Sequence, residues 1–70
     1  MAWRKPSRQK ILRMIDLADR KGFTVERYPY RTDGWKMFDA AGNRIQPDPE
    51  TPLFTTEGAT LFLLKQQDRA

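Results

Sequence analysis

Basic side chains are concentrated in the first third of this 70-residue chain. Residues 1–21 hold seven Lys or Arg side chains against two Asp side chains, whereas residues 47–70 hold two basic and four acidic side chains. Lys10, Arg13 and Arg20 recur at helical spacing, and Arg8 precedes them. Clustered cations bind polyanions, most commonly the phosphates of nucleic acids. The pattern predicts a nucleic-acid contact, and a solvated helix face explains it equally well.

The chain contains neither cysteine nor histidine. Without Cys there can be no disulfide, thiolate zinc site or cysteine nucleophile, which fits a reducing compartment. Without His the chain lacks the usual general base near neutral pH and the commonest metal ligand, and its carboxylates are scattered singly. We therefore expect no catalytic residue, no metal and no cofactor, and favour a binding protein over an enzyme.

The composition predicts a single small domain over residues 1–70. Charged residues make up 31% of the chain and hydrophobic ones 39%, and the formal net charge is +4. No apolar run approaches the ~18 residues of a transmembrane helix, and no apolar stretch follows the basic start as in a secretory signal. We expect a cytoplasmic protein without membrane contact, whose residues 1–6 form a flexible basic tail.

Residues 7–21 have the pattern of an amphipathic helix. Ser7 can cap its start and Gly22 can take the left-handed conformation that ends it. The spacing places five apolar residues on a buried face, Ile11, Leu12, Met14, Ile15 and Ala18. It places a second stripe on the opposite face, Lys10, Arg13, Leu17 and Arg20.

A period of two follows, which predicts strands over residues 23–28, 35–39 and 44–46. Alternation directs Trp35 and Met37 to the core, and Lys36 and Phe38 to the opposite face. Residues 39–43 read as a turn closed by glycine, and the third strand is expected at a sheet edge because Pro47 cannot donate to a ladder.

Three prolines predict an extended loop over residues 47–55, before a last helix capped by Thr55 or Thr56. That helix has a wide apolar face, made by Ala59, Leu61, Phe62, Leu63 and Leu64. The order is then α-β-β-β-α. The expected fold class is α+β, a two-layer sandwich of two helices on a three-stranded antiparallel sheet.

Aromatic side chains form a second candidate surface. Tyr28 and Tyr30 lie in the long loop before the second strand, beside Arg31, and suit a protein interface, although a Tyr-Pro-Tyr loop is equally well a stiff turn. Trp35 and Phe38 could stack on bases or join that interface. The core is the favoured place for Trp35.

The order and length resemble double-stranded-RNA-binding domains, and several short segments resemble the HicA family over residues 8–67. These segments are Lys10-Ile11-Leu12, Lys21-Gly22-Phe23-Thr24-Val25 with Arg27, Gly34-Trp35-Lys36-Met37-Phe38, Gly42-Asn43-Arg44-Ile45 and Leu63-Leu64-Lys65-Gln66. HicA proteins are small bacterial toxins of toxin–antitoxin pairs that cleave messenger RNA, and related genes occur in phages and mobile elements. The resemblance implies the same fold and an RNA ligand.

The chain departs from this family at the catalytic position. The family carries a histidine just after a glycine at the start of the second strand, where this chain reads Asp33-Gly34-Trp35. Asp33, expected as an exposed turn residue, is a weak base, and Lys36 does not replace the histidine. Ribonuclease activity is expected to be absent or residual.

The sequence thus supports two hypotheses. The first is an RNA-binding or other nucleic-acid-binding HicA-like protein without the catalytic histidine, whose contacts are Arg8, Lys10, Arg13 and Arg20, flanked by Arg31 and Lys36. The alternative is a phage or mobile-element module that binds and inhibits a host protein through Tyr28, Tyr30, Trp35 and Phe38. An antitoxin is a further candidate protein partner.

Overall fold

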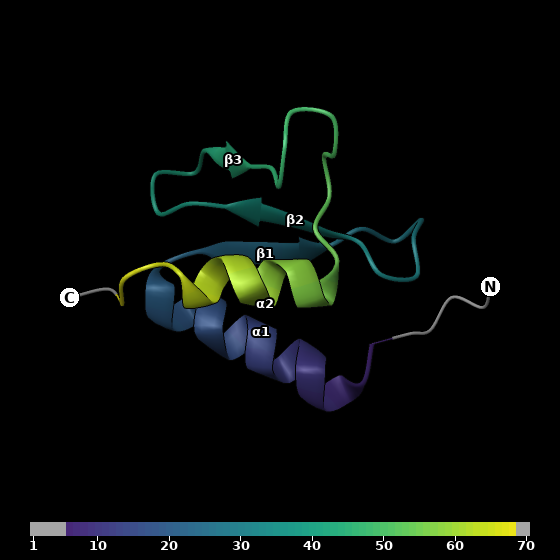
Figure 1. The fold of residues 1–70 in the computed structure, drawn as a ribbon, viewed down its shortest axis with the longest axis horizontal. Helices are drawn as coiled ribbons and strands as arrows, with labels where there is room; N and C mark the ends of the chain where they lie inside the picture. The colour runs from purple at the N-terminus through teal and green to yellow at the C-terminus, as the bar shows by residue number, and fades with distance from the viewer. Residues whose placement is uncertain (1–5, 69–70) are drawn as a thin grey trace.

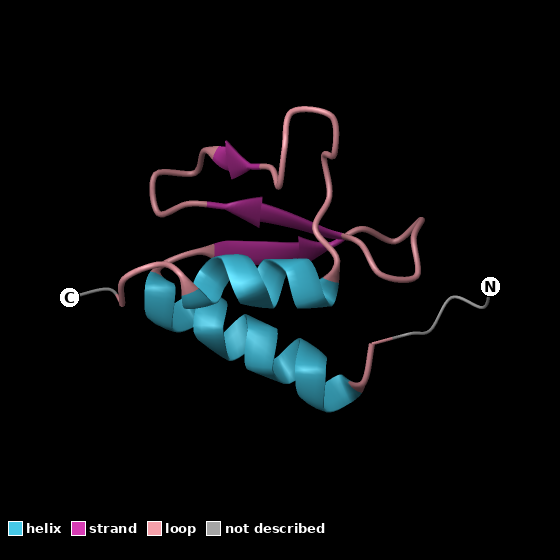
Figure 2. Ribbon diagram, in the orientation of Figure 1, coloured by secondary structure: helices cyan, strands magenta, loops and turns pink. Residues whose placement is uncertain are grey.

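Two helices lie side by side against one face of a three-stranded antiparallel sheet (Figures 1 and 2). This computed structural model describes residues 6–68, so all of the predicted tail except Pro6 lies outside the described residues. The elements are α1 (Arg8–Lys21), β1 (Thr24–Arg27), β2 (Trp35–Phe38), β3 (Arg44–Ile45) and α2 (Thr56–Leu64). The predicted α-β-β-β-α sandwich is confirmed.

Local interactions end α1 where the sequence predicts. The Ser7 hydroxyl accepts a hydrogen bond from the Lys10 backbone N–H at 3.2 Å. At the other end Gly22 has a φ of 81°, and its N–H donates to the carbonyls of the last turn. A left-handed residue in this place satisfies carbonyls that have no partner within the helix, and glycine adopts that conformation without a steric penalty.

The buried face of α1 differs from the predicted one. Met14, Leu17 and Ala18 are buried, whereas Leu12 and Ile15 remain 54% and 42% exposed. The reason is that α1 packs against α2 as well as β1, which turns the helix so that Leu17 enters the core. The prediction of Leu17 on the solvent face, and of Leu12 and Ile15 in the core, is therefore wrong.

The sheet has the order β1-β2-β3, and its strands are shorter than predicted. Arg27 pairs with Trp35 across β1 and β2, and Met37 pairs with Ile45 across β2 and β3. Trp35 and Met37 are buried, as the alternation predicts, while Phe38 is half-buried. The helices therefore cover the face that carries Trp35 and Met37.

The proline-rich loop leaves the sheet after β3 and then returns to it. Phe54 lies beside Trp35, and the two residues exchange backbone hydrogen bonds of 2.8 and 2.9 Å. Pro47 has no N–H to continue the ladder, so the edge strand is interrupted until Phe54 resumes it. The last residues of the predicted loop, Leu53 and Phe54, are buried.

A compact apolar core joins the two layers, made by Met14, Leu17, Ala18, Trp35, Met37, Phe54, Ala59 and Leu63. Every buried side-chain nitrogen or oxygen within residues 6–68 has a hydrogen-bond partner. In the same range, neither helix has the length and apolar character needed to cross a membrane.

The turn between β2 and β3 depends on one carboxylate. Asp39 Oδ1 accepts hydrogen bonds from the backbone N–H groups of Ala41 and Asn43, both at 2.9 Å. The hydrogen bond from Asn43 is the main cause that lowers the pKa of Asp39 below its ordinary value. Hydrogen bonds to the ionised form favour that form.

We expect Asp39→Asn to lower the free energy of unfolding at neutral pH and to leave it nearly unchanged in acid. Because the pKa of Asp39 is lower in the folded state, its carboxylate stabilises the fold above the ordinary pKa of about 3.9 and loses that effect as the pH falls through the folded value. Urea unfolding from neutral pH to about pH 2 measures the effect, with Glu26→Gln as the control. A difference that stays constant with pH would contradict the assignment.

Candidate nucleic-acid interface

Four of the six predicted cationic contacts lie at one end of the molecule. Arg8, Lys10 and Arg13 are exposed on the first half of α1, and Arg31 is exposed on the loop between β1 and β2. Figure 1 shows the start of α1, this loop and the start of α2 at the same end. None of the four makes an ion pair with another residue of the described range. Their charges are therefore available to a ligand.

The other two cations lie apart. Arg20 is near the far end of α1, where its Nη2 is 2.7 Å from Asp16 Oδ2, and the hydrogen bond to Asp16 raises the pKa of the guanidinium. Lys36 lies on β2, with its ammonium 5.8 Å from the centre of the Tyr28 ring. Since side chains alternate along a strand, Lys36 is on the sheet face opposite to Trp35 and the helices. The structure does not bring Arg20 and Lys36 to the basic end.

A hydrogen-bond network ties the three elements of this end together. The backbone N–H and the hydroxyl of Thr56 both donate to Asp33 Oδ1, at 2.8 and 2.7 Å. The indole N–H of Trp35 donates to Thr56 Oγ1 at 2.9 Å. Asp33 thus caps the first turn of α2 from the β1–β2 loop, alongside Thr55, the N-cap residue, whose hydroxyl accepts from the Gly58 N–H.

This network corrects the prediction of Asp33 as an exposed turn residue. Its side chain is partly buried, and its partner Thr56 is only 2% exposed. No sequence pattern links the two residues, which are 23 positions apart. The carboxylate at the position nearest to the family's histidine is therefore occupied in holding α2.

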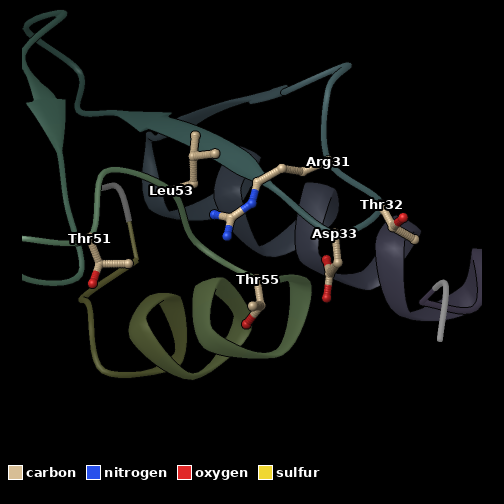
Figure 3. A pocket seen from close by; sticks show the side chains of 6 residues that line it. All are labelled: Arg31, Thr32, Asp33, Thr51, Leu53 and Thr55. Carbon is tan, nitrogen blue, oxygen red and sulfur yellow. The ribbon is translucent and has the colours of Figure 1, made fainter. Parts of the chain in front are cut away.

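A cleft of about 310 Å³ lies beside the network, lined by Arg31, Thr32, Asp33, Thr51, Leu53 and Thr55. Figure 3 shows Arg31 reaching from its loop toward the segment that carries Leu53 and Thr55. A Cβ on Gly34 would lie 3.2 Å from Arg31 Cβ and 3.3 Å from Leu53 Cδ1, so the glycine permits this close approach. The cleft offers one cation and threonine hydroxyls, which suit a phosphate group.

A second hollow, of about 240 Å³, separates the two helices, and we call it the interhelical groove. It is lined by Lys10, Arg13, Thr56, Glu57, Thr60, Leu61 and Leu64. Leu61 and Leu64 are 55% and 48% exposed, although the sequence predicts them on the apolar face of α2. The available signal was that apolar residues occupy more of α2 than one face can bury.

The aromatic residues predicted for a protein interface divide into two groups. Tyr28 and Tyr30 pack edge to face, with ring centres 5.5 Å apart, and Tyr30 is 83% exposed. Trp35 is 7% exposed and lies in the core, so the prediction that it serves an interface is wrong. The buried network with Thr56 is the physical reason. Phe38 is half-buried on the open face of the sheet.

Within residues 6–68 no three acidic side chains come close enough together to hold a metal ion. Searches against protein-family models, curated proteins and solved structures found no match to the chain. The geometry of the basic end therefore carries the functional argument.

We expect Thr56→Val to lower the free energy of unfolding by about 1–3 kcal/mol, because it leaves the Trp35 indole N–H buried without an acceptor and removes one donor to Asp33. Thr56→Ser, which keeps the hydroxyl, should lose much less. Urea unfolding followed by tryptophan fluorescence measures both variants. Equal stability of the two variants would show that the hydroxyl does not support the fold.

Proposed function

We propose that this protein is a HicA-like nucleic-acid-binding domain, with RNA as its principal ligand in the cytoplasm, and that it lacks the nuclease chemistry of that family. The observation that carries the proposal is the gathering of Arg8, Lys10, Arg13 and Arg31 at one end, without ion pairs among the described residues. Such unpaired cations release counterions from a phosphate backbone, which supplies most of the binding free energy.

The spacing of these cations supports a contact with a phosphate backbone. Lys10 and Arg13 are three residues apart on α1, which corresponds to about 4.5 Å along the helix axis. Successive phosphates of one strand are about 3.4 Å apart along a duplex axis, so both side chains can reach neighbouring phosphates of one strand. Arg31 adds a contact from the loop across the first turn of α2.

The absence of a base supports the second half of the proposal. The position after Gly34 is taken by Trp35, which is buried and donates its indole N–H to Thr56. The preceding carboxylate of Asp33 accepts two hydrogen bonds from Thr56, so accepting a substrate proton would weaken the cap of α2. General-base catalysis is worth about 10²–10⁴-fold in rate, and neither residue is placed to supply it.

We expect a labelled single-stranded RNA to bind at about 50 mM salt and to bind more weakly as salt rises. Lys10→Gln/Arg13→Gln should lower the affinity roughly tenfold and reduce the salt slope by about two, one for each lost phosphate contact. Lys36→Gln, on the opposite face of the sheet, is the control and should change neither quantity. Fluorescence anisotropy over a salt series measures both. Undetectable binding at low salt, or an equal loss in the control, would exclude the proposed surface.

We expect the purified protein not to cleave RNA at neutral pH above the background of buffer, because no group of the chain supplies the missing histidine. Gel analysis of a labelled RNA after prolonged incubation measures this. The Lys10→Gln/Arg13→Gln variant, purified in the same way, reveals contaminating nuclease, since contamination would act equally in both samples. Robust cleavage by the unmodified protein alone would contradict the proposal.

A further inference from the structure

The second helix carries more apolar surface than the fold covers. Ala59 and Leu63 of α2 are fully buried, and Phe62 packs against the core from its edge. Leu61 and Leu64 nevertheless remain about half exposed on the outer side of the same helix. An exposed apolar patch next to polar groups is typical of an interaction site in a small domain. The two leucines are therefore candidates for contact with a partner.

The interhelical groove gives this patch a defined shape. Thr60, Leu61 and Leu64 of α2 line it together with Lys10 and Arg13 of α1. Its length is limited by α2, whose nine residues span about 13 Å. This length matches two to three turns of a helix, and a groove between two packed helices presents ridges that accept a third.

The charges at the groove favour one sign of partner. Lys10 and Arg13 border the leucines and make no ion pair within residues 6–68. Glu57, the only acidic residue that lines the groove among those described, lies in the first turn of α2. Acidic side chains beside the apolar ones of a partner would thus meet opposite charges along the wall that α1 provides.

We propose that the interhelical groove binds an amphipathic acidic helix of two to three turns from a partner protein. Its apolar residues would recur at i, i+3 or i+4 and i+7 to cover Leu61 and Leu64, and its carboxylates would pair with Lys10 and Arg13. The inference goes beyond nucleic-acid binding. Because both ligands use Lys10 and Arg13, the helix and a nucleic acid exclude each other on this surface.

The probe is a labelled helical peptide of about 14 residues, with leucines at this spacing and glutamates beside them. We expect it to bind the full chain with a Kd below about 100 µM by fluorescence anisotropy. Backbone amide shifts in NMR spectra should change at Thr60, Leu61 and Leu64. A peptide with lysines in place of the glutamates should bind at least about tenfold more weakly, because it faces like charges.

A matched pair of variants locates the contact. Leu61→Ser/Leu64→Ser should weaken peptide binding by at least about tenfold, since both anchors lose apolar contact. Leu12→Ser removes an equally exposed leucine from α1 and does not touch the groove, so it should leave the affinity unchanged. Circular dichroism verifies that the variants are folded, as expected for exposed positions.

Three results would overturn the proposal: no peptide binding by the folded protein, equal binding of the acidic and basic peptides, or unchanged binding by Leu61→Ser/Leu64→Ser. If the leucine variant loses RNA affinity while the peptide does not bind, the groove belongs to the nucleic-acid surface instead. The peptide assay contains no nucleic acid. Failure of the groove proposal is therefore distinguishable from failure of the proposed function, which the RNA salt series tests separately.

Discussion

The fold of this small domain depends on one buried hydroxyl. Thr56 receives the indole N–H of Trp35 and donates to the carboxylate of Asp33, so a single side chain connects β2, the β1–β2 loop and α2. A domain of this size has a small core, and the chain has no disulfide to support it. Breaking a buried network leaves donors and acceptors without water, which gives these few hydrogen bonds a large influence on stability.

Both hollows of the basic end follow from this connection. Thr55 lines the Arg31 cleft, and Thr56 and Glu57 line the interhelical groove, so the two hollows meet at the first turn of α2. Asp33 fixes that turn from the loop that carries Arg31. The positions of Arg31 and of the groove leucines are therefore coupled through the same cap, and a change in Thr56 would disturb both surfaces.

The distribution of charge is decided as much by ion pairs as by composition. At the far end of α1, Arg20 pairs with Asp16, and Lys21 pairs with Asp68 and donates to the Gln66 carbonyl. These contacts neutralise cations that the sequence places in the same basic stretch as Lys10. The unpaired charge is left on the first half of α1, which gives the molecule one cationic end suited to a polyanion.

The local features of this chain could be predicted from its residues because the interactions that produce them span few positions. Ser7 and Gly22 end α1 through hydrogen bonds within one turn, and the alternation at Trp35 and Met37 places both in the core. The rotation of α1 could not be predicted, because apolar residues surround more than half of that helix and only packing against α2 selects Leu17 over Leu12. Likewise, the contact of Asp33 with Thr56 joins positions 23 apart, which no local pattern encodes. The exposed pair on α2 has the same origin, since hydropathy records how apolar a side chain is, whereas its burial depends on which neighbours the fold brings to it.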